Sequence, residues 1–563
     1  MRKAVPIGHE DLKTFIDRNL YYVDKTLMIR ELLDEAASVT LLTRPRRFGK
    51  TLNLSMVRRF FEDERTMNGE KTDNSYIFDG LAISGCGEEY MRHCGQYPVI
   101  NLSLKLAKQK NYELAYEELK KRISEEFERH QYILEGQLIP ADKKEIYSLI
   151  MARADEESLY LDAIRFLSEC LYRYHGKNAI ILIDEYDVSL ENAYLEGFYD
   201  EMSSFIRSLF ESALKTNRFL EFGMITGCLR ISRESIFTGL NNLQIHSILS
   251  GSYGDAFGFT EEDVKAMLDY YDISGSYGEL KEWYDGYRFG NAEIYNPWSI
   301  VKYVSSVLAG DEIPTRAYWS NTSSNGIIRE LVDDADGETR RELEVLMEGG
   351  TIEKPIHEEI TYADIHESQD NLWNFLFFTG YLKVGSQRKD GEDIYLQLSI
   401  PNREVKYVYR QSIRIWFDRK ARGIDKRPLI KALEEGDCRA AEDFISRQLM
   451  DTISYFDYAE NYYHGFLTGL LSGTGDYEVL SNRESGTGRP DIILMEKKFM
   501  GRAMVLELKV AQSFHEMEEK CRQALAQIEE QNYGTPLEAD GYRPILKYGI
   551  CFFKKGCQVV GRT

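Results

Sequence analysis

The sequence contains no long hydrophobic run. Its longest uninterrupted apolar stretch, residues 179–183, is far shorter than the roughly 20 residues that a membrane-spanning helix needs. The opening residues, MRKAVPIGHEDLK, include no apolar segment like the core of a secretory signal. We therefore expect a soluble protein without membrane contacts, located in the cytoplasm.

Paired cysteines are also lacking. The eight cysteines lie at positions 86, 94, 170, 228, 438, 521, 551 and 557, and none forms a Cys-x-x-Cys pair. Cys86, His93 and Cys94 are close in sequence, but their spacing fits no common zinc site. Ordinary reduced cysteines are expected, which agrees with the cytoplasm.

Positive charge is scarce, because 70 Lys and Arg stand against 92 Asp and Glu, a net charge of −22. This balance argues against a general nucleic-acid coat but allows a local basic channel. Residues 403–431 are the candidate, with three acids and ten basic residues: Arg403, Lys406, Arg410, Arg414, Arg419, Lys420, Arg422, Lys426, Arg427 and Lys431. The solvated face of two helices explains this basic stretch equally well.

What is present is a large globular chain. Its 563 residues predict three or four domains, and a hydrophobic content of 43% with 12% aromatics indicates packed cores. No internal repeat or low-complexity tract interrupts it.

Residues 39–54, VTLLTRPRRFGKTLNL, read as strand, loop and helix. A loop ending in Gly-Lys-Thr between a strand and a helix is typical of a phosphate-binding loop. We expect the backbone from Arg47 through Phe48 and Gly49 to face an anion, Lys50 to reach the outer phosphates and Thr51 to hold Mg²⁺. Arg44 stands where the first glycine of the usual pattern belongs.

A second motif supports this prediction. Residues 179–188, AIILIDEYDV, form an apolar strand that ends in Asp184 and Glu185. There Asp184 can bind Mg²⁺ through water, and Glu185 can orient an attacking water. Residues 222–232 predict a strand lying between the two motif strands, with Thr226 at its tip to sense the outer phosphate. Arg230 nearby would stabilise charge in the transfer or pair with Glu185 in the resting state.

The first 255 residues therefore predict an α/β P-loop domain with a parallel sheet. YPVINLSL (97–104) supplies a strand, HSILSG (246–251) a fifth strand, and residues 108–175 a helical insertion. We expect a helical lid over residues 256–350, where Thr260 and Asp263 form a capping box and WYDGYRF (283–289) and YNPWSI (295–300) form aromatic loops. Residues 351–430 predict a winged-helix-like module that includes the basic stretch, or a packing adapter without a ligand.

Residues 431–563 predict a second α/β domain. A helix over 458–471 precedes a strand, a Gly-rich turn and a strand carrying Asp491, and AMVLELKV (503–510) places Glu507 and Lys509 on one side of the next strand. Two neighbouring carboxylates repel each other unless a divalent cation lies between them. We expect Asp491 and Glu507 to bind Mg²⁺ and Lys509 to position the attacking water. Glu460 and Glu484 are expected to complete the metal site, and Gln527 to brace it.

Taken together, these stretches resemble the bacterial AAA-ATPase-like proteins with a C-terminal PD-(D/E)XK nuclease domain. The resemblance is carried in order by YYVDKT, RPRRFGKTLNLSM, ILIDEYD, TGCLRISRESIFTGLNNL, WYDGYRFG, YNPWSI, GYLKV and GRPDIIL…LELKV. It implies a P-loop ATPase of the additional-strand class fused to a restriction-endonuclease-like fold. In that family RPRRFGKT is the usual form of the loop.

The sequence thus predicts an ATP-binding, Mg²⁺-dependent nuclease gated by nucleotide, acting on a nucleic acid with DNA favoured over RNA. An alternative is a non-cutting nucleotide-dependent switch whose C-terminal domain binds nucleic acid or protein. A DNA-translocating motor is less favoured, because no helicase motif series follows Asp184 and Glu185. Homo-oligomerisation stays open.

Overall fold

A computed structural model describes the chain apart from residues 1, 106–107, 230–235, 238–240, 274–276, 320–327, 329–330, 334, 359–367, 424, 451–459, 474, 482–487, 499 and 563. It divides into two compact units. Unit 1 comprises Met1–Ser323 and Thr351–Tyr407, and unit 2 comprises Ser324–Gly350 and Val408–Thr563. Within the described residues, no helix is both long enough and apolar enough to cross a membrane. The prediction of four parts is finer than these two units and remains a prediction.

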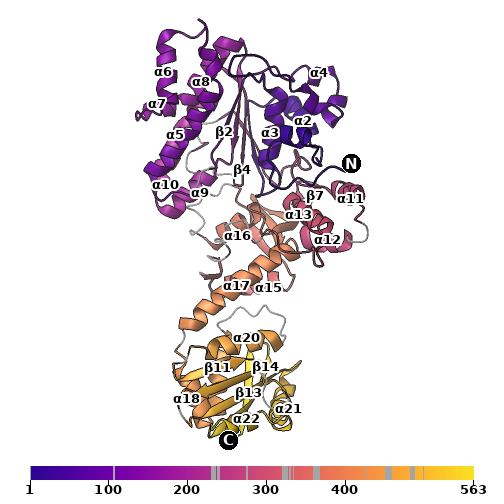
Figure 1. The fold of residues 1–563 in the computed structure, drawn as a ribbon, viewed down its shortest axis with the longest axis vertical. Helices are drawn as coiled ribbons and strands as arrows, with labels where there is room; N and C mark the ends of the chain where they lie inside the picture. The colour runs from indigo at the N-terminus through magenta and orange to yellow at the C-terminus, as the bar shows by residue number, and fades with distance from the viewer. Residues whose placement is uncertain are drawn as a thin grey trace. The chain divides into compact units, whose positions relative to one another are not determined.

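Unit 1 is built on a five-stranded parallel sheet with the order β2-β3-β4-β1-β5. Figure 1 labels two of its strands, β2 and β4. Its strands are β1 (Val39–Thr43), β2 (Val99–Ser103), β3 (Ala179–Asp184), β4 (Leu220–Gly227) and β5 (Leu243–His246). The predicted parallel sheet is confirmed, and β4 does lie between the two motif strands β1 and β3. The fifth strand was misplaced, because β5 ends at His246, where the predicted strand began.

The central strands are apolar on both faces because helices cover both sides of the sheet. Every residue of β1 and β3 is buried. Figure 1 shows α2 (Leu27–Glu35) and α3 (Lys50–Phe61) on one side, and α5 (Tyr112–Arg129) and α8 (Ala163–His175) on the other. The predicted insertion is helical, as expected, and also contains η3 (Gln131–Leu134), α6 (Ala141–Met151) and α7 (Ser158–Leu161). Shorter or flanking elements are α1 (Leu12–Asp17), η1 (Ser75–Phe78), η2 (Ala82–Gly85), α4 (Glu88–Met91), α9 (Val188–Glu196), α10 (Tyr199–Phe210) and η4 (Glu211–Lys215).

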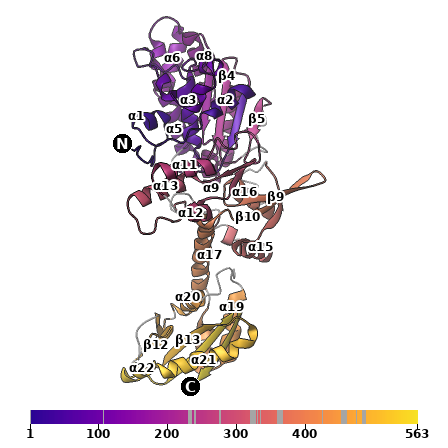
Figure 2. The ribbon, with the colours of Figure 1, turned by 90° about the vertical axis from the view of Figure 1, so that its right-hand side faces the viewer.

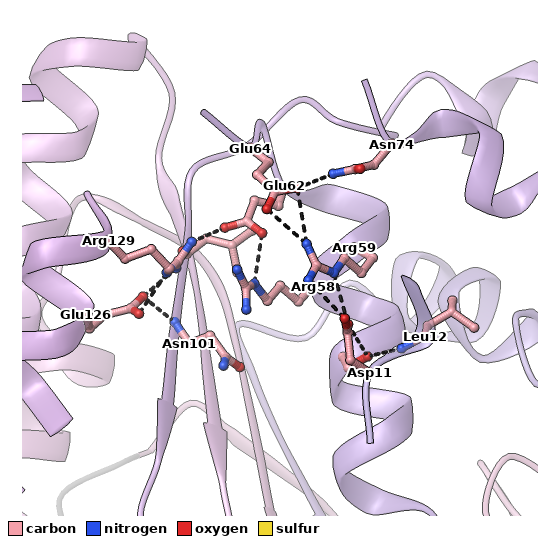
Figure 3. Close-up of polar contacts among 12 residues, drawn as sticks. Asp11, Leu12, Arg58, Arg59, Glu62, Glu64, Asn74, Asn101, Glu126 and Arg129 are labelled. Atoms are coloured by element: carbon pink, nitrogen blue, oxygen red, sulfur yellow. Dashed lines mark hydrogen bonds and ion pairs between the residues drawn. The ribbon is translucent and has the colours of Figure 1, made fainter. Parts of the chain in front are cut away.

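A buried ion-pair network fastens the edge strand β2 to helices α3 and α5 (Figure 3). Arg129 of α5 pairs with Glu62, directly after α3, and with Glu126, at 2.5 Å. The Glu126 carboxylate also accepts the backbone N–H of Asn101 on β2 at 2.7 Å. Positive charges thus compensate both buried glutamates, and the pKa of Glu62 and of Glu126 lies below its ordinary value.

The middle region of unit 1 corrects one prediction. The two aromatic stretches predicted as loops contain the end of α12 (Tyr277–Tyr284), the hairpin strand β6 (Tyr287–Phe289) and the start of α13 (Pro297–Leu308). β6 pairs with β7 (Ala292–Ile294). The turn residues around Gly286 and Gly290 suggested a loop, but they separate short elements instead. The capping box of α11 (Glu261–Tyr270) is present between Thr260 and Asp263.

A three-stranded antiparallel sheet closes unit 1. Its strands β8 (Ile352–Pro355), β9 (Lys383–Asp390) and β10 (Asp393–Ser399) follow the order β8-β10-β9. The predicted succession of helix, turn and two strands is confirmed by α16 (Gln369–Phe378), β9 and β10. The tip of the β9–β10 hairpin carries Asp390, Glu392 and Asp393 beside Arg388 and Lys389, so its charge is mixed. This mixture does not favour phosphate contacts at the hairpin.

Unit 2 contains a mixed five-stranded sheet with the order β11-β12-β13-β14-β15. The strands are β11 (Tyr477–Ser481), β12 (Ile492–Glu496), β13 (Ala503–Val510), β14 (Ile545–Phe553) and β15 (Gly556–Arg562), and only β13 and β14 among these neighbours run parallel. Helix α20 (Glu460–Leu471) packs its buried Tyr463 and Leu467 against this sheet. Figure 2 shows α21 (Met517–Glu530) lying across β13. The remaining elements of unit 2 are α15 (Gly337–Met347), α18 (Arg427–Glu435), α19 (Cys438–Met450), η6 (Phe514–Glu516) and α22 (Thr535–Ala539).

Helix α17 (Arg403–Gly423) is shared between the units. Its first five residues belong to unit 1, and from Val408 onward it belongs to unit 2. The predicted basic stretch therefore falls on α17 and α18, and the side chains of residues 417–424 lie outside the described part.

Candidate functional site

The loop between β1 and α3 forms the first candidate site. Arg47 and Gly49 both adopt left-handed backbone conformations, with φ of 72° and 85°, and Gly49 is the N-cap of α3. Such a loop turns backbone N–H groups toward the space in front of the helix, where the helix dipole favours an anion. The buried ring of Phe48 packs on Tyr287 and Phe289 and keeps this part of the loop in place.

Lys50 and Thr51 occupy the first turn of α3. The Lys50 ammonium donates to the loop's own carbonyl oxygens, those of Arg44 at 2.9 Å and Pro45 at 3.0 Å. The Thr51 hydroxyl donates to Asp184 Oδ2 at 2.7 Å, and the Thr226 hydroxyl donates to Oδ1 of the same carboxylate. The structure therefore brings three predicted nucleotide residues, Thr51, Asp184 and Thr226, together at the carboxyl ends of neighbouring strands.

Arg44 occupies the position of the first glycine in the usual pattern of a phosphate-binding loop. The side chain is fully buried and turned away from the loop, and it donates to the carbonyl oxygens of His246 at 2.9 Å and Tyr253 at 3.0 Å. Its guanidinium also lies over the rings of Phe257 and Phe289. Burial lowers the pKa of Arg44 to about 9. Arg44 thus ties the loop to the segment after β5.

Glu185 follows directly after β3 with a left-handed φ of 49°, a conformation that a non-glycine residue adopts at some energetic cost. Burial raises its pKa, an effect that the positive charges of Lys50 and Lys105 oppose. Lys105, two residues past β2, was missed in the sequence, because nothing in the strand pattern marks it.

Asp187 was also missed, although it belongs to the same DEYD motif. Its Oδ2 accepts the backbone N–H groups of Cys228 at 2.8 Å and Leu229 at 3.3 Å, so it holds the chain that leaves β4. Burial raises the pKa of Asp187. Arg230 follows directly but lies outside the described residues, and its predicted place in the site stays a prediction.

The second candidate site lies where β12 and β13 meet. The antiparallel register pairs Ile492 with Leu506, so continuing it by one residue places Asp491 opposite Glu507. Asp491 was predicted to lie within a strand, but it directly precedes β12. The strand begins only after Gly488 and Pro490. Asp491 Oδ2 accepts the backbone N–H of Leu508 at 2.8 Å.

Lys509 reaches the same place from β13. Its ammonium lies 3.4 Å from Glu507 Oε1, and Glu507 Oε2 accepts the backbone N–H of Asp491 at 3.4 Å. Glu507 is only 2% exposed, and burial together with the Asp491 carboxylate raises its pKa to about 7. Two converging carboxylates beside one lysine suit a hard divalent cation such as Mg²⁺, which needs only one or two protein carboxylates.

His464 of α20 is a further residue at this site that sequence reasoning missed. Its Nε2 lies 2.9 Å from the backbone oxygen of Asp491 and 3.0 Å from Ser481 Oγ. These contacts link His464 of α20 to the backbone of Asp491 and to the end of β11. The only sequence signal was its position four residues after Glu460 on the same helix face.

Three of the predicted residues cannot be placed with the others. Glu484 lies outside the described residues, and the side chain of Glu460 is likewise not described. Gln527 is on α21, and its predicted role remains a prediction. Among the described residues, no group of three or more His, Cys, Asp or Glu side chains forms a metal-binding cluster.

Comparison with known proteins agrees with this arrangement. Residues 6–237 match the family model described as predicted AAA-ATPase, and residues 458–561 match that of the PD-(D/E)XK nuclease superfamily. The chain is similar to the "Uncharacterized protein in vnfD 5'region" of Azotobacter chroococcum mcd 1, with 24% identity over 577 residues that cover 100% of this chain and 98% of that protein. The predicted order, an AAA-ATPase-like region followed by a PD-(D/E)XK nuclease-like region, is confirmed.

Proposed function

We propose that the protein is an ATP-binding, Mg²⁺-dependent nuclease that hydrolyses phosphodiester bonds of nucleic acid, with ATP binding in unit 1 controlling cleavage in unit 2. The observation that carries the proposal is the convergence of Asp491, Glu507 and Lys509 at the junction of β12 and β13. Burying two carboxylates side by side costs free energy, which a cation between them would offset.

Each residue of the nuclease site has a distinct part in this proposal. Asp491 is oriented by the N–H of Leu508, and Glu507 by the N–H of Asp491, so both present oxygens from neighbouring strands. Bound Mg²⁺ would supply Lewis-acid activation of a water and charge stabilisation. Lys509, one pleat from Glu507, would hold the attacking water and neutralise developing negative charge.

In unit 1, ATP phosphates would replace the loop carbonyls as partners of Lys50, while Thr51 and Asp184 would hold the accompanying Mg²⁺. Glu185 would orient the attacking water, and Thr226 would contact the outer phosphate through its hydroxyl. The proposed substrate is nucleic acid, with DNA favoured over RNA.

The nuclease proposal is tested by comparing Asp491→Ala with Lys509→Ala. Asp491→Ala should lose both Mg²⁺ affinity, measured by calorimetry, and cleavage, because it removes a metal ligand. Lys509→Ala should keep Mg²⁺ affinity within about threefold and lose cleavage by about 10²-fold, as expected for a group that assists proton transfer or charge stabilisation. Substrate binding should persist in both, since phosphate contacts elsewhere position the strand.

Asp476→Ala is the matched control, because Asp476 is an exposed aspartate of the same unit. It should cleave at the wild-type rate. Wild-type cleavage by an Asp491→Ala, Lys509→Ala double variant would contradict the proposal. Absence of cleavage by wild type on DNA and RNA, with and without ATP, would favour the non-cutting switch instead.

A further inference from the structure

Glu404 is a fully buried carboxylate in the first turn of α17. Its Oε1 accepts the backbone N–H of Trp319 at 2.7 Å, and its Oε2 accepts the hydroxyl of Ser299 at 2.7 Å. Ser299 lies in the first turn of α13. The carboxylate therefore joins three segments of unit 1 that are far apart in the sequence.

No lysine, arginine or histidine of the described chain forms an ion pair with this carboxylate. Burial raises the pKa of Glu404 to about 7, and the charge of Arg47 is the cationic influence that opposes the rise. Reciprocally, burial lowers the pKa of Arg47 to about 10, and Glu404 leads the charges that oppose this. The two groups therefore stabilise each other's charged forms.

Arg47 belongs to the phosphate loop. Its guanidinium donates to the backbone oxygen of Trp319 at 3.0 Å and lies 5.9 Å from the ring centre of Trp298. The same Trp319 donates its N–H to Glu404. The backbone of Trp319 thus accepts a hydrogen bond from Arg47 of the phosphate loop and donates one to Glu404 at the start of α17.

A packed aromatic path runs beside this polar one. The ring of Phe48 contacts Tyr287, which contacts Trp319, and Trp319 stacks on Tyr381 at 4.8 Å between ring centres. Trp319 is 1% exposed, so its displacement would disturb several neighbours at once.

The start of α17 is held by a second polar residue. Asn402 Oδ1 accepts the N–H of Val405 at 3.0 Å, and Asn402 Nδ2 donates to the backbone oxygen of Asp285 at 2.7 Å. From Val408 onward the same helix belongs to unit 2. A change at its first turn therefore acts on an element that continues into the other unit.

We infer that the link Arg47–Trp319–Glu404 reports occupancy of the phosphate loop to the first turn of α17. This inference rests on the proposed ATP binding and specifies how it is transmitted. ATP phosphates attract the Arg47 guanidinium, so the Trp319 carbonyl loses its donor and Glu404 loses the cation that faces it. The Trp319–Glu404 contact then loosens.

Hydrogen exchange read by mass spectrometry tests the link on the full-length protein. Mg²⁺·ATP should speed amide exchange about fivefold or more in peptides covering residues 314–319 and 403–410. Glu404→Gln, which keeps the shape and removes the charge, should exchange fast in both peptides without ATP and show no further change with it. Calorimetry should still detect ATP binding to this variant.

Glu282→Gln is the matched control. Glu282 forms an exposed ion pair with Arg403 of the same helix turn, at 2.9 Å, without contacting the link. This variant should respond to ATP as wild type does. An equal response by Glu404→Gln would overturn the inference.

Wild type alone also decides the question, whether or not a variant folds. Bound ATP that leaves both peptides unchanged would overturn the inference while leaving the proposed ATP binding intact. A wild type that binds no ATP by calorimetry would overturn both.

Discussion

At the scale of single residues, the three arginines of the phosphate loop each have a separate anchor. Arg44 donates to carbonyl oxygens at the end of β5 and after it, Arg46 pairs with Glu191 on α9, and Arg47 donates to Trp319. A glycine-rich loop would rely on backbone freedom at these positions. Here side chains hold the loop in shape, so its conformation depends on the surrounding elements.

The raised pKa of Glu404 predicts how the free energy of unfolding of unit 1 depends on pH. Its pKa is about 7 in the folded protein, against about 4.3 in an unfolded chain, so the folded state binds this proton more tightly. The free energy of unfolding of unit 1 should therefore fall as pH rises from about 5 to 8, by an amount of the order of 3 kcal/mol from this group. The donors facing it are the Ser299 hydroxyl and the N–H groups of Tyr318 and Trp319, with Arg47 as the nearby cation.

Thermal unfolding at pH 5.5 and pH 8 measures this effect. Glu404→Gln should gain stability relative to wild type as pH rises, because it has no carboxyl proton to lose. Glu282→Gln, which changes an exposed glutamate, should keep the wild-type pH dependence. A constant difference between Glu404→Gln and wild type at both pH values would contradict the raised pKa.

At the scale of elements, the proposed phosphate contact of the loop between β1 and α3 rests on Lys50. Lys50→Ala should weaken ATP binding at least tenfold, because it removes the charge facing the outer phosphates. Calorimetry measures the affinity, with Lys215→Ala, an exposed lysine at the end of η4, as the control. Glu185→Gln should bind ATP and lose hydrolysis. Unchanged affinity in Lys50→Ala would show that this loop is not the ATP site.

Elements with strong patterns could be predicted from the sequence, and the reasons are physical. The apolar runs of β1 and β3 must be buried on both faces, which requires a parallel sheet covered by helices. β5 was misplaced because Leu243–His246 is only four residues long, and the adjacent apolar pair Ile248 and Leu249 drew the predicted strand toward the C-terminus. The hairpin β6–β7 is only three residues per strand, too short for a clear period.

The residues of the candidate sites also fall into those that local spacing could predict and those that depend on tertiary packing. Asp491, Glu507 and Lys509 were predictable, because their spacing on short strands determines which side chains meet. The contact of Arg47 with Trp319 joins residues 272 positions apart and depends on how α13 and α17 pack, which no local pattern encodes. His464 and Lys105 were not predicted either, because their contacts also depend on tertiary packing.

At the scale of the whole molecule, two compact units predict two unfolding transitions. Mg²⁺·ATP should raise only the transition that contains unit 1, because a ligand stabilises the part that binds it. At a concentration of 100 times its Kd, the gain is about 2.7 kcal/mol. Differential scanning calorimetry measures both transitions.

Lys50→Ala serves as the control here, since a tenfold loss of affinity should reduce the gain of its unit 1 transition at the same ATP concentration to about 1.4 kcal/mol. Equal shifts of both transitions in wild type would show that the two units unfold together. A shift confined to the transition of unit 2 would mean that ATP binds unit 2, and this would contradict the proposed ATP site in unit 1.

Helix α17 has a consequence for engineering, because one continuous helix leaves unit 1 and enters unit 2. Adding one residue after its first turn rotates everything downstream by about 100° and advances it by about 1.5 Å, whereas adding seven restores the rotation nearly and lengthens the helix by about 10 Å. A series of alanine insertions therefore separates the effect of angular phase from that of spacing. Activity that recovers at seven residues would mean that the rotational phase of the helix matters. Activity that declines steadily with each added residue would mean that its length matters.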